Sequence, residues 1–355
     1  MQKITVLITG CSKHSKELID ALKENSDGIQ VDTVAVNMDG NKLLRHGTDY
    51  QYIAPPITDE GYIPFLKRVC EETHTDIILP YITAELELMA KHKQEFEAMG
   101  VHVSVASEDN IRILNDKIKF WQNYQKYMPE QHVCNDLPSL NSALNGLRKR
   151  GRKLCCKISG KCGGTGFCIV DPLKATDITL FNRCGVNRYI SYKDLEHIIR
   201  MGHEVILQEY VPGVDYSVCV LADHGETINM VGYAGYDMEY GAVVNGEIVT
   251  NKKAFRVVQR IVKDIGLDGN ACFDFMLAGV NRESSHEDLQ KAPVKLLECN
   301  PRINASIGFC KEAGVNLAYM RCKQLLGTLD EDEARYVIPL EGLHMQKYYE
   351  SEYFL

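Results

Sequence analysis

The first 112 residues alternate strand-like and helix-like segments, and this rhythm constrains the fold more than any other feature of the sequence. Residues 4–9, 31–37 and 76–80 are apolar runs typical of buried strands, with helical patterns between them. Strands that alternate with helices of about 10 to 15 residues predict a parallel sheet with crossover helices. We therefore expect a Rossmann-like α/β domain over residues 1–112. Residues 10–15, GCSKHS, lack the glycine spacing of a dinucleotide site, so we do not expect this domain to bind a dinucleotide.

Beyond residue 112 the segments indicate antiparallel strands rather than crossover units. Residues 152–170 predict two short strands around a glycine-rich turn, where a hairpin is more natural than a crossover. The clearest helical periodicity covers residues 252–266. Residues 281–292 are expected to form a charged, polar loop. Further strand-like runs occupy residues 204–211, 216–222, 227–237, 270–279 and 293–300. The second part of the chain is therefore predicted to be α+β.

The charge balance limits the classes of partner. The chain has 40 basic and 48 acidic residues and a formal net charge of −8. Such a balance gives no general attraction to nucleic acid or to anionic membranes. We therefore expect small-molecule partners, with no nucleic acid and no membrane among them.

The cysteines and the N-terminus bear on location. The 13 cysteines are scattered and form no C-x-x-C pair, so we expect reduced thiols in the cytoplasm. Residues 8–11, ITGC, resemble a lipoprotein cleavage box. However, the apolar run before them is shorter than the about 7 to 15 residues of a signal-peptide core, and a first β-strand explains it better. No stretch approaches the about 18 apolar residues of a membrane-spanning helix.

The strand-like segment LLECNPR, residues 296–302, has an unusually polar face. Side chains along a strand point alternately to opposite faces, so Glu298 and Asn300 share one face. The same rule places Asp274 on one face of its strand, with Phe273 and Phe275 on the other. If the two strands are neighbours, three hard oxygen ligands converge, and such ligands favour Mg²⁺ over Zn²⁺. A solvent-facing strand is the alternative for each residue taken singly.

Two other segments carry weaker signals. The glycines of residues 157–166, KISGKCGGTG, would let the backbone approach a ligand and aim N–H groups at phosphate oxygens, within reach of Lys157. The segment lacks the spacing of a Walker A loop, and a structural hairpin is an equal alternative. Near Pro212 a strand breaks between Glu209 and Asp215, which could expose backbone groups to a base and a ribose. Taken alone, that break is more typical of a plain turn.

In this order, the motifs resemble those of the ATP-grasp superfamily, within it the carbamoyl-phosphate synthase large-chain-like branch. The resemblance rests on NDK at 115–117, K-x-x-G-x-x-G-G-x-G from Lys157, QEYVPGVDYSV, FDF and, most specifically, ECNPR. It implies an ATP-grasp fold in which two α+β lobes grip ATP behind the Rossmann-like domain. The small lobe with its phosphate flap would span residues 113–208, and the large lobe with the Mg²⁺ and phosphate site residues 209–355.

The resemblance also implies how the nucleotide would bind. Lys117 and Lys157 would face the phosphates and the purine, and the glycine-rich turn from Gly160 would close over the phosphates. Residues 209–211 would hold adenine, and Asp215 would hold the ribose hydroxyls. The predicted nucleotide-binding residues are Lys117, Lys157, Gly163, Gly164, Gly166, Glu209, Tyr210, Val211 and Asp215.

The implied catalytic site lies on the polar strand face. Asp274, Glu298 and Asn300 would bind one or two Mg²⁺, with Mn²⁺ as a substitute, and Arg302 would stabilise the transferred phosphoryl group together with Lys157. Aspartate at position 274 departs from this branch, which often has glutamine there. The additional negative charge strengthens the metal prediction.

The activity implied is that of an ATP-dependent carboxylate-amine ligase, which forms an acyl phosphate and releases ADP and phosphate. The alternatives are a carbamoyl-phosphate-synthase-like kinase acting on bicarbonate or carbamate, and an ATP-binding regulator without turnover. A small-molecule, amino-acid-like substrate is expected near Arg302, Asn304 and Ser306. Glu85, at the carboxyl end of a parallel strand, could attract an amine, although an acid beginning a helix more often only favours that helix. A homodimer is a further expectation.

Overall fold

The N-terminal domain is built on a parallel five-stranded sheet with the order β3-β2-β1-β4-β5. The computed structural model describes residues 3–158, 167–175, 189–239, 242–348 and 351. The strands are β1 (Lys3–Thr9), β2 (Gln30–Asn37), β3 (Tyr50–Ile53), β4 (Ile77–Pro80) and β5 (His102–Val103). Helices α1 (Lys16–Lys23), α2 (Tyr62–Thr73) and α3 (Leu86–Glu97) connect them. The expected Rossmann-like architecture is confirmed, with β3 as an additional short edge strand.

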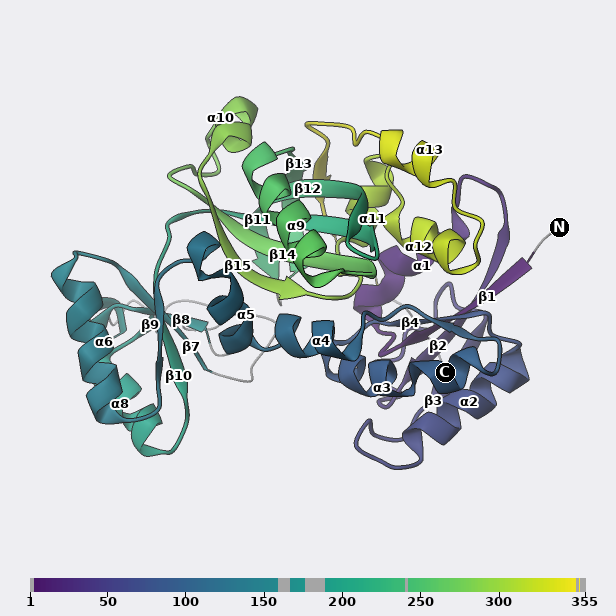
Figure 1. The fold of residues 1–355 in the computed structure, drawn as a ribbon, viewed down its shortest axis with the longest axis horizontal. Coiled ribbons are helices and arrows are strands. Elements are labelled where there is room, and N and C mark those ends of the chain that lie inside the picture. Colours follow the sequence, from purple (N-terminus) through teal and green to yellow (C-terminus); the bar gives the residue numbers. More distant parts are fainter. Residues whose placement is uncertain (1–2, 159–166, 176–188, 240–241, 349–350, 352–355) are drawn as a thin grey trace.

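Two helices lead from this domain to the next sheet. In Figure 1, α4 (Glu108–Leu114) and α5 (Lys117–Tyr124) run between the N-terminal domain on the right and the smaller lobe on the left. The side chain of Asp116 caps α5 by accepting hydrogen bonds from the backbone N–H groups of Ile118 and Lys119. Lys117 is therefore fixed as the first residue of α5.

The small lobe is a five-stranded sheet with the order β6-β10-β7-β8-β9. Its strands are β6 (Gln131–Cys134), β7 (Leu154–Ile158), β8 (Phe167–Val170), β9 (Tyr189–Ile190) and β10 (Val205–Glu209). Helices α6 (Leu137–Lys149) and α8 (Tyr192–Arg200) bury their apolar stripes against one face, where Leu154, Cys156 and Leu207 belong to the same cluster as Leu144 and Leu195. The short helix α7 (Pro172–Ala175) follows β8.

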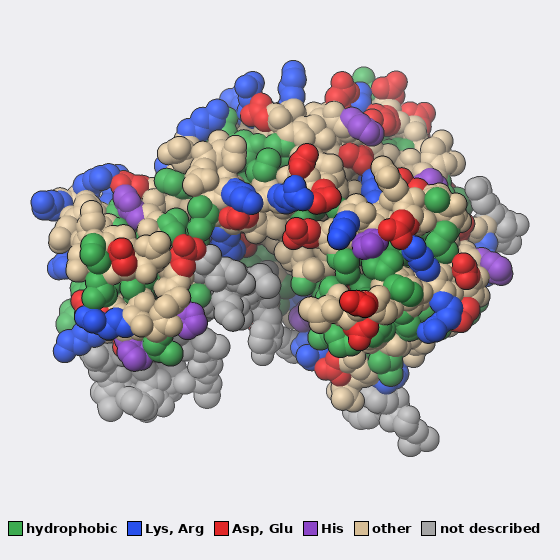
Figure 2. Space-filling model, turned by 60° about the horizontal axis from the view of Figure 1, so that its bottom comes forward, with side chains coloured by type: hydrophobic (Ala, Val, Ile, Leu, Met, Phe, Trp, Pro, Cys, Tyr) green, Lys and Arg blue, Asp and Glu red, His purple; other side chains and the backbone are tan. Residues whose placement is uncertain are grey.

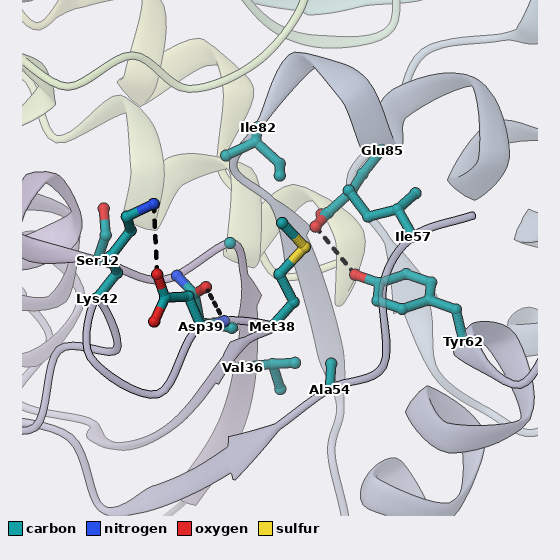
Figure 3. A pocket seen from close by; sticks show the side chains of 12 residues that line it. Ser12, Val36, Met38, Asp39, Lys42, Ala54, Ile57, Tyr62, Ile82 and Glu85 are labelled. Atoms are coloured by element: carbon teal, nitrogen blue, oxygen red, sulfur yellow. Dashed lines mark hydrogen bonds and ion pairs between the residues drawn. The ribbon is translucent and has the colours of Figure 1, made fainter. Parts of the chain in front are cut away.

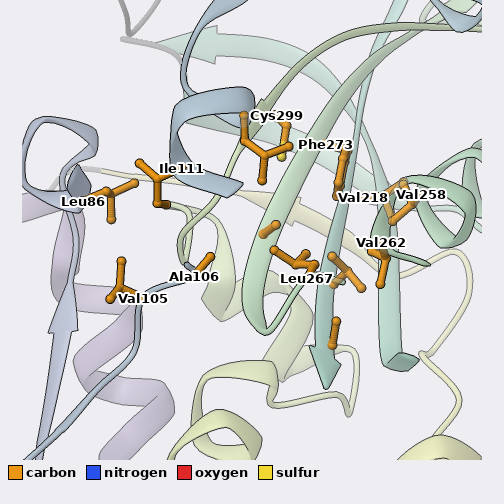
Figure 4. Packing of buried hydrophobic residues seen from close by; sticks show 14 of the residues in the cluster. Leu86, Val105, Ala106, Ile111, Val218, Val258, Val262, Leu267, Phe273 and Cys299 are labelled. Atoms are coloured by element: carbon orange, nitrogen blue, oxygen red, sulfur yellow. The ribbon is translucent and has the colours of Figure 1, made fainter. Parts of the chain in front are cut away.

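The large lobe is an antiparallel six-stranded sheet with the order β15-β14-β11-β12-β13-β16. Its strands are β11 (Gly213–Asp223), β12 (Glu226–Glu239), β13 (Ala242–Ile248), β14 (Gly269–Ala278), β15 (Val294–Asn300) and β16 (His344–Gln346). Helix α9 (Lys252–Ile265) covers one face, and Figure 4 shows its Val258 and Val262 packed with Val218 and Phe273. Because that face is filled by apolar side chains, the polar side chains of the same strands lie on the other face.

The N-terminal domain packs against the large lobe. Helices α11 (Ile307–Glu312) and α12 (Leu317–Leu325) contact α1, and α13 (Glu331–Tyr336) lies against β12. The buried Arg321 of α12 donates from Nη1 and Nη2 to the two carboxylate oxygens of Asp268 at 3.0 and 3.1 Å. Its Nε donates to Oγ of Ser104 in the N-terminal domain at 3.2 Å. One buried guanidinium thus ties the two units together.

One predicted loop is wrong. Residues 281–292 include the helix α10 (His286–Lys291), which the polar composition concealed. Ser285 and Asp288 form a capping box, in which each side chain accepts the other's backbone N–H. The pattern S-x-x-D was present in the sequence as a helix-start signal.

The distribution of charged side chains and the state of the cysteines match the expectations from the composition. Figure 2 shows basic and acidic side chains interspersed over the face displayed, which is hollowed between the small lobe and the N-terminal domain. Within the described ranges, no helix is long and apolar enough to cross a membrane. The 11 cysteines in those ranges are free thiols, and ten of them are buried.

Candidate functional site

The predicted metal ligands meet on adjacent strands of the large lobe. In the β14–β15 ladder, Asp274 lies opposite Glu298 and Cys272 lies opposite Asn300. Opposite residues of an antiparallel pair share a face, so the three polar side chains stand on the face away from α9. The register shifts directly after Asp274, where Phe275 pairs with Leu296. This bulge is the kind of local irregularity that re-aims side chains beside active sites.

Hydrogen bonds hold Asp274 in place. Its Oδ1 accepts from Ser217 Oγ at 2.7 Å, and its Oδ2 accepts from Asn300 Nδ2 at 3.0 Å. Burial, followed by the nearby negative charge of Glu298, raises the pKa of Asp274 to about 7. Two carboxylates and an amide oxygen in such proximity form a hard donor set that suits Mg²⁺. The residues present therefore fit the predicted metal.

Three cationic side chains surround these carboxylates. Lys117 Nζ lies 2.5 Å from Glu298 Oε2. Burial alone would raise the pKa of Glu298, but the positive charges of Lys117 and Lys157 outweigh it and lower that pKa. Burial lowers the pKa of Lys157, although the charge of Glu298 opposes that effect. The first residue of α5 and the fourth of β7 are thus brought to the polar face of β14 and β15.

Arg302 connects this cluster to the N-terminal domain. Its Nε donates to Thr83 Oγ1 at 3.2 Å, and its Nη1 donates to the carbonyl of Ile303 at 2.9 Å. Thr83 begins the short 3-10 helix η2 (Thr83–Glu85) at the carboxyl end of β4. The positive charge of Arg302 acts on both Asp274 and Glu298. The site is therefore assembled from all three sheet-bearing units.

The register of the small lobe shows which residues share a face with Lys157. Cys155 pairs with Gln208 and Lys157 pairs with Ile206, so these four residues share one face. The opposite face is the one covered by α6 and α8. Gln208 thus lies on the same face as Lys157, whereas Glu209 lies on the other, where its Oε1 contacts Arg152 Nη1 at 2.5 Å. The structure does not bring the Glu209 carboxylate together with Lys157.

Gln208 is not among the predicted site residues, but it lies on the same face as Lys157. It is 2% exposed, and Gln131, its partner on β6, is 5% exposed. Each has a buried Nε2 with no hydrogen-bond partner among the described residues. An unsatisfied buried amide costs about 1–3 kcal/mol, so these two amides are an unusual feature of the face that carries Lys157. Gln208 and Glu209 are adjacent in VILQEYV, so they point to opposite faces of the strand. The sequence alone does not show which of them shares a face with Lys157.

The other predicted nucleotide-binding residues lie in different surroundings, and some lie outside the described residues. The backbone N–H of Tyr210 donates to the carbonyl of Lys153 at 2.8 Å, and Val211 follows it where β10 ends. Asp215 is exposed on β11, on the same face as Ser217, and its negative charge helps raise the pKa of Asp274. The glycines of the predicted flap, Gly160, Gly163, Gly164 and Gly166, lie outside the described residues.

The two residues proposed beyond Arg302 are part of a structural loop. Asn304 Nδ2 donates to Tyr233 Oη at 2.5 Å and to Cys272 Sγ at 3.2 Å, while its Oδ1 accepts from Ser306 N. Ser306 is 2% exposed and precedes α11. These bonds hold the loop that follows Arg302, and the expected substrate contact of Asn304 and Ser306 stays a prediction.

Glu85 lies in the N-terminal domain, beside a pocket. Its carboxylate accepts from Tyr62 Oη at 2.9 Å (Figure 3). It also accepts from Thr9 Oγ1. Burial raises the pKa of Glu85 to about 7. The side chain is therefore not merely a solvated acid at the start of a helix.

Two family models match parts of the chain. Residues 6–104 match the family model described as PylC-like, N-terminal domain. Residues 202–349 match the model described as ATP-grasp in the biosynthetic pathway with Ter operon. The C-terminal part of the chain is therefore similar to ATP-grasp proteins. A search of curated proteins found no match.

Solved ATP-grasp structures share the fold at low sequence identity. An ADP complex of N5-carboxyaminoimidazole ribonucleotide synthetase has 12% identity and a TM-score of 0.61, with 91% of this chain and 76% of that chain covered. The L-amino acid ligase from Bacillus licheniformis has 14% identity and a TM-score of 0.61, with 96% and 78% covered. A biotin carboxylase complex from Campylobacter jejuni has 16% identity and a TM-score of 0.61, with 96% and 74% covered. The predicted ATP-grasp fold is confirmed.

The unpaired amide of Gln208 gives a test of whether this face of the small lobe binds ATP. We expect Gln208→Met to raise the free energy of unfolding without nucleotide by about 1 kcal/mol, because it removes a buried unsatisfied donor. The same change should raise the Kd for ATP about tenfold, through the loss of one hydrogen bond. Urea denaturation and calorimetry measure the two effects.

The exposed Gln122 on α5 supplies the control, Gln122→Met. Unchanged ATP affinity in Gln208→Met would remove Gln208 from the site.

The raised pKa of Glu85 predicts a pH dependence of stability. Because the folded pKa of about 7 exceeds the ordinary 4.5, the folded state binds more protons between these values. The contribution of Glu85 to stability should therefore fall as pH rises from about 4.5 to about 7, by about 3 kcal/mol in total. Relative to the wild type, Glu85→Gln should become more stable across this window and stay level above it. Denaturation at pH 5, 6, 7 and 8 measures the difference, and a constant difference would contradict the buried-acid assignment.

Proposed function

We propose that the protein is an ATP-dependent carboxylate-amine ligase acting on small, amino-acid-like molecules. The observation that carries the proposal is the convergence of three oxygen donors with cations from three parts of the chain. Asp274 and Glu298 stand opposite each other on β14 and β15, and Asn300 is bonded to Asp274. Lys117, Lys157 and Arg302 act on the same carboxylates. This is the charge arrangement required for phosphoryl transfer, which depends on positioning and charge neutralisation.

Asp274, Glu298 and Asn300 would hold Mg²⁺, which when bound would neutralise charge on the ATP phosphates. Lys157 and Lys117 would bind the phosphates, so Lys117 would exchange part of its contact with Glu298 for a phosphate oxygen. Gln208 would donate to the base. These roles divide the site into a base end on the small lobe and a phosphoryl end on the large lobe.

The reaction would proceed in two steps. A substrate carboxylate oxygen attacks the γ-phosphorus, the bond to the β-phosphate oxygen breaks, and ADP leaves. Arg302 would stabilise the charge on the transferred group from the side of the N-terminal domain. An amine nitrogen then attacks the acyl carbon of the acyl phosphate, phosphate departs and the nitrogen loses a proton. No covalent intermediate with the protein is required, so the buried cysteines have no role in these steps.

A second candidate is activation of bicarbonate. The structural neighbours include biotin carboxylases, one of them described in complex with MgADP and bicarbonate. Bicarbonate would use the same phosphoryl site and Arg302, but it would leave the pocket beside Glu85 without a role. For that reason we favour the amino-acid-like carboxylate.

An ADP-release screen over pairs of carboxylates and amines, with mass spectrometry of the products, tests the proposal. Release that requires both partners, with a product lighter than their sum by one water, supports the ligase. Release with bicarbonate alone supports the second candidate. ATP binding without release across the panel would contradict both and favour an ATP-binding regulator.

A further inference from the structure

A pocket of about 210 Å³ opens at the carboxyl ends of β1, β2 and β4 in the N-terminal domain. Ligands of open parallel sheets bind at this edge of the strands. The volume is below the about 300–1,000 Å³ typical of drug-sized ligands, so the pocket suits a smaller molecule. Most of its lining is apolar, with Val36, Met38, Ala54, Ile57 and Ile82 around it (Figure 3).

Glu85 is the buried acidic group of this lining, and burial raises its pKa to about 7. It is 2% exposed, and no basic side chain of the described residues forms an ion pair with it. Asp39, also in the lining, is by contrast paired with Lys42 at 3.4 Å at the more exposed end. A buried carboxylate without a cation is costly. The pocket is therefore electrostatically incomplete at Glu85.

The hydrogen bonds of Glu85 fix its orientation but leave acceptor positions of its carboxylate unused. Tyr62 and Thr9 each donate one hydroxyl hydrogen, one to each carboxylate oxygen. A carboxylate offers about four acceptor positions, so about two remain for a ligand. Hydroxyl donors fix the carboxylate without cancelling its charge. A protonated amine would supply both the missing cation and the missing donors.

The pocket also adjoins the phosphoryl site through η2. Glu85 ends this 3-10 helix, and Thr83, which begins it, accepts a hydrogen bond from Arg302. A ligand held by Glu85 therefore lies within one helical turn of the residue that contacts Arg302. The pocket and Arg302 are thus linked through a single short helix.

We propose that this pocket binds the amino group of an amine-bearing carboxylic acid, with its protonated nitrogen against Glu85 and its apolar part against Met38, Ile57 and Ile82. This inference rests on the proposed ligase function for one step: the carboxylate of the same molecule is the group activated beside Arg302. An ammonium group held by a carboxylate has no lone pair to attack with, so the molecule in the pocket is the acyl donor. The attacking amine comes from the other substrate.

Binding to the full-length protein without nucleotide tests the pocket directly. The probes are glycine, L-alanine, L-valine, L-leucine and L-methionine, with N-acetyl-L-valine and 2-oxoisovalerate as analogues that lack the ammonium group. Saturation-transfer NMR and calorimetry should detect at least one amino acid with a Kd of 10 mM or tighter. The analogues should bind at least tenfold more weakly.

Two variants and a matched control locate the site. Glu85→Gln keeps the shape of the side chain and should weaken amino-acid binding at least tenfold. Met38→Trp, at a position that is 59% exposed at the mouth of the pocket, should also weaken it and does not depend on the fold tolerating a change at Glu85. Glu97→Gln, at an exposed acid of α3, should bind as the wild type does.

The outcomes separate this inference from the ligase proposal. No amino-acid binding, equal binding of the N-acetyl analogue, or wild-type affinity in both pocket variants would overturn the pocket assignment, even if ADP release with other carboxylates upheld the ligase. Amino-acid binding that is lost in the variants would uphold the pocket, even if no ADP were released.

Discussion

Replacing Glu298 with glutamine should lower the rate of ADP formation by about 10³-fold while leaving the fold intact. Glu298 supplies one of the two carboxylates of the candidate Mg²⁺ site and contacts Lys117. Metal-assisted charge stabilisation contributes several kcal/mol to such reactions, and about 4 kcal/mol corresponds to about 10³ in rate. Steady-state ADP release at saturating ATP and Mg²⁺ measures the effect.

The fold should survive this change because Glu298→Gln also removes a like charge that faces Asp274. Circular dichroism and thermal unfolding check the fold. Glu312→Gln, at an acid that is 66% exposed and paired with Lys311, provides the matched control and should keep wild-type turnover. Turnover within threefold of wild type in Glu298→Gln would remove Glu298 from the metal site.

Replacing Arg302 with lysine should lower kcat for ADP formation by about 10²- to 10³-fold with little change in the Kd for ATP. An arginine that stabilises a transferring phosphoryl group is worth about 10³–10⁵ in kcat, and lysine keeps the charge but loses the planar fork. Single-turnover kinetics and calorimetry separate the two quantities.

Thr83→Val tests how Arg302 is held. The change removes the hydroxyl that accepts from Arg302 Nε and retains a similar shape. We expect about a tenfold loss of kcat, smaller than that of Arg302→Lys, with ATP binding unchanged. A loss confined to ATP affinity in Arg302→Lys would contradict its role in phosphoryl transfer.

The common face of Glu298 and Asn300 was predictable because strand alternation is a local rule. Glu298 and Asn300 are two residues apart on one strand, so their common face follows from the sequence. Their convergence with Asp274 needed the pairing of β14 with β15, which the sequence alone left conditional. The structure supplies that register, including the bulge after Asp274.

The sequence could not show which of Gln208 and Glu209 shares a face with Lys157, because that depends on the register between distant strands. Glu209 and Gln208 are adjacent, and only the pairing of β10 with β7 shows which of them faces the same side as Lys157. A choice between neighbours on a strand reverses with a shift of one residue. The unpaired amides of Gln131 and Gln208 became visible only with burial and hydrogen bonding in three dimensions.

The surroundings of Asn304, Ser306 and Glu85 were the hardest to predict from the sequence. Asn304 and Ser306 continued the polar spacing of β15 but belong to a loop bonded to Tyr233 and Cys272. Glu85 was predicted from its place after a strand as a group that could attract an amine, whereas the absence of a cation beside it depends on the surrounding side chains. The short helix α10 and the edge strand β3 were not predicted, because short elements show little periodicity in the sequence.

The central claim is that a carboxylate is activated as an acyl phosphate, and isotope transfer tests it most directly. The acyl-donor substrate found by the ADP-release screen is labelled with ¹⁸O in both carboxylate oxygens and turned over with ATP and the amine. The account predicts that each phosphate released carries one ¹⁸O, visible as an isotope shift in the ³¹P NMR spectrum, because the attacking carboxylate oxygen stays with phosphorus. Product formation with unlabelled phosphate would contradict it.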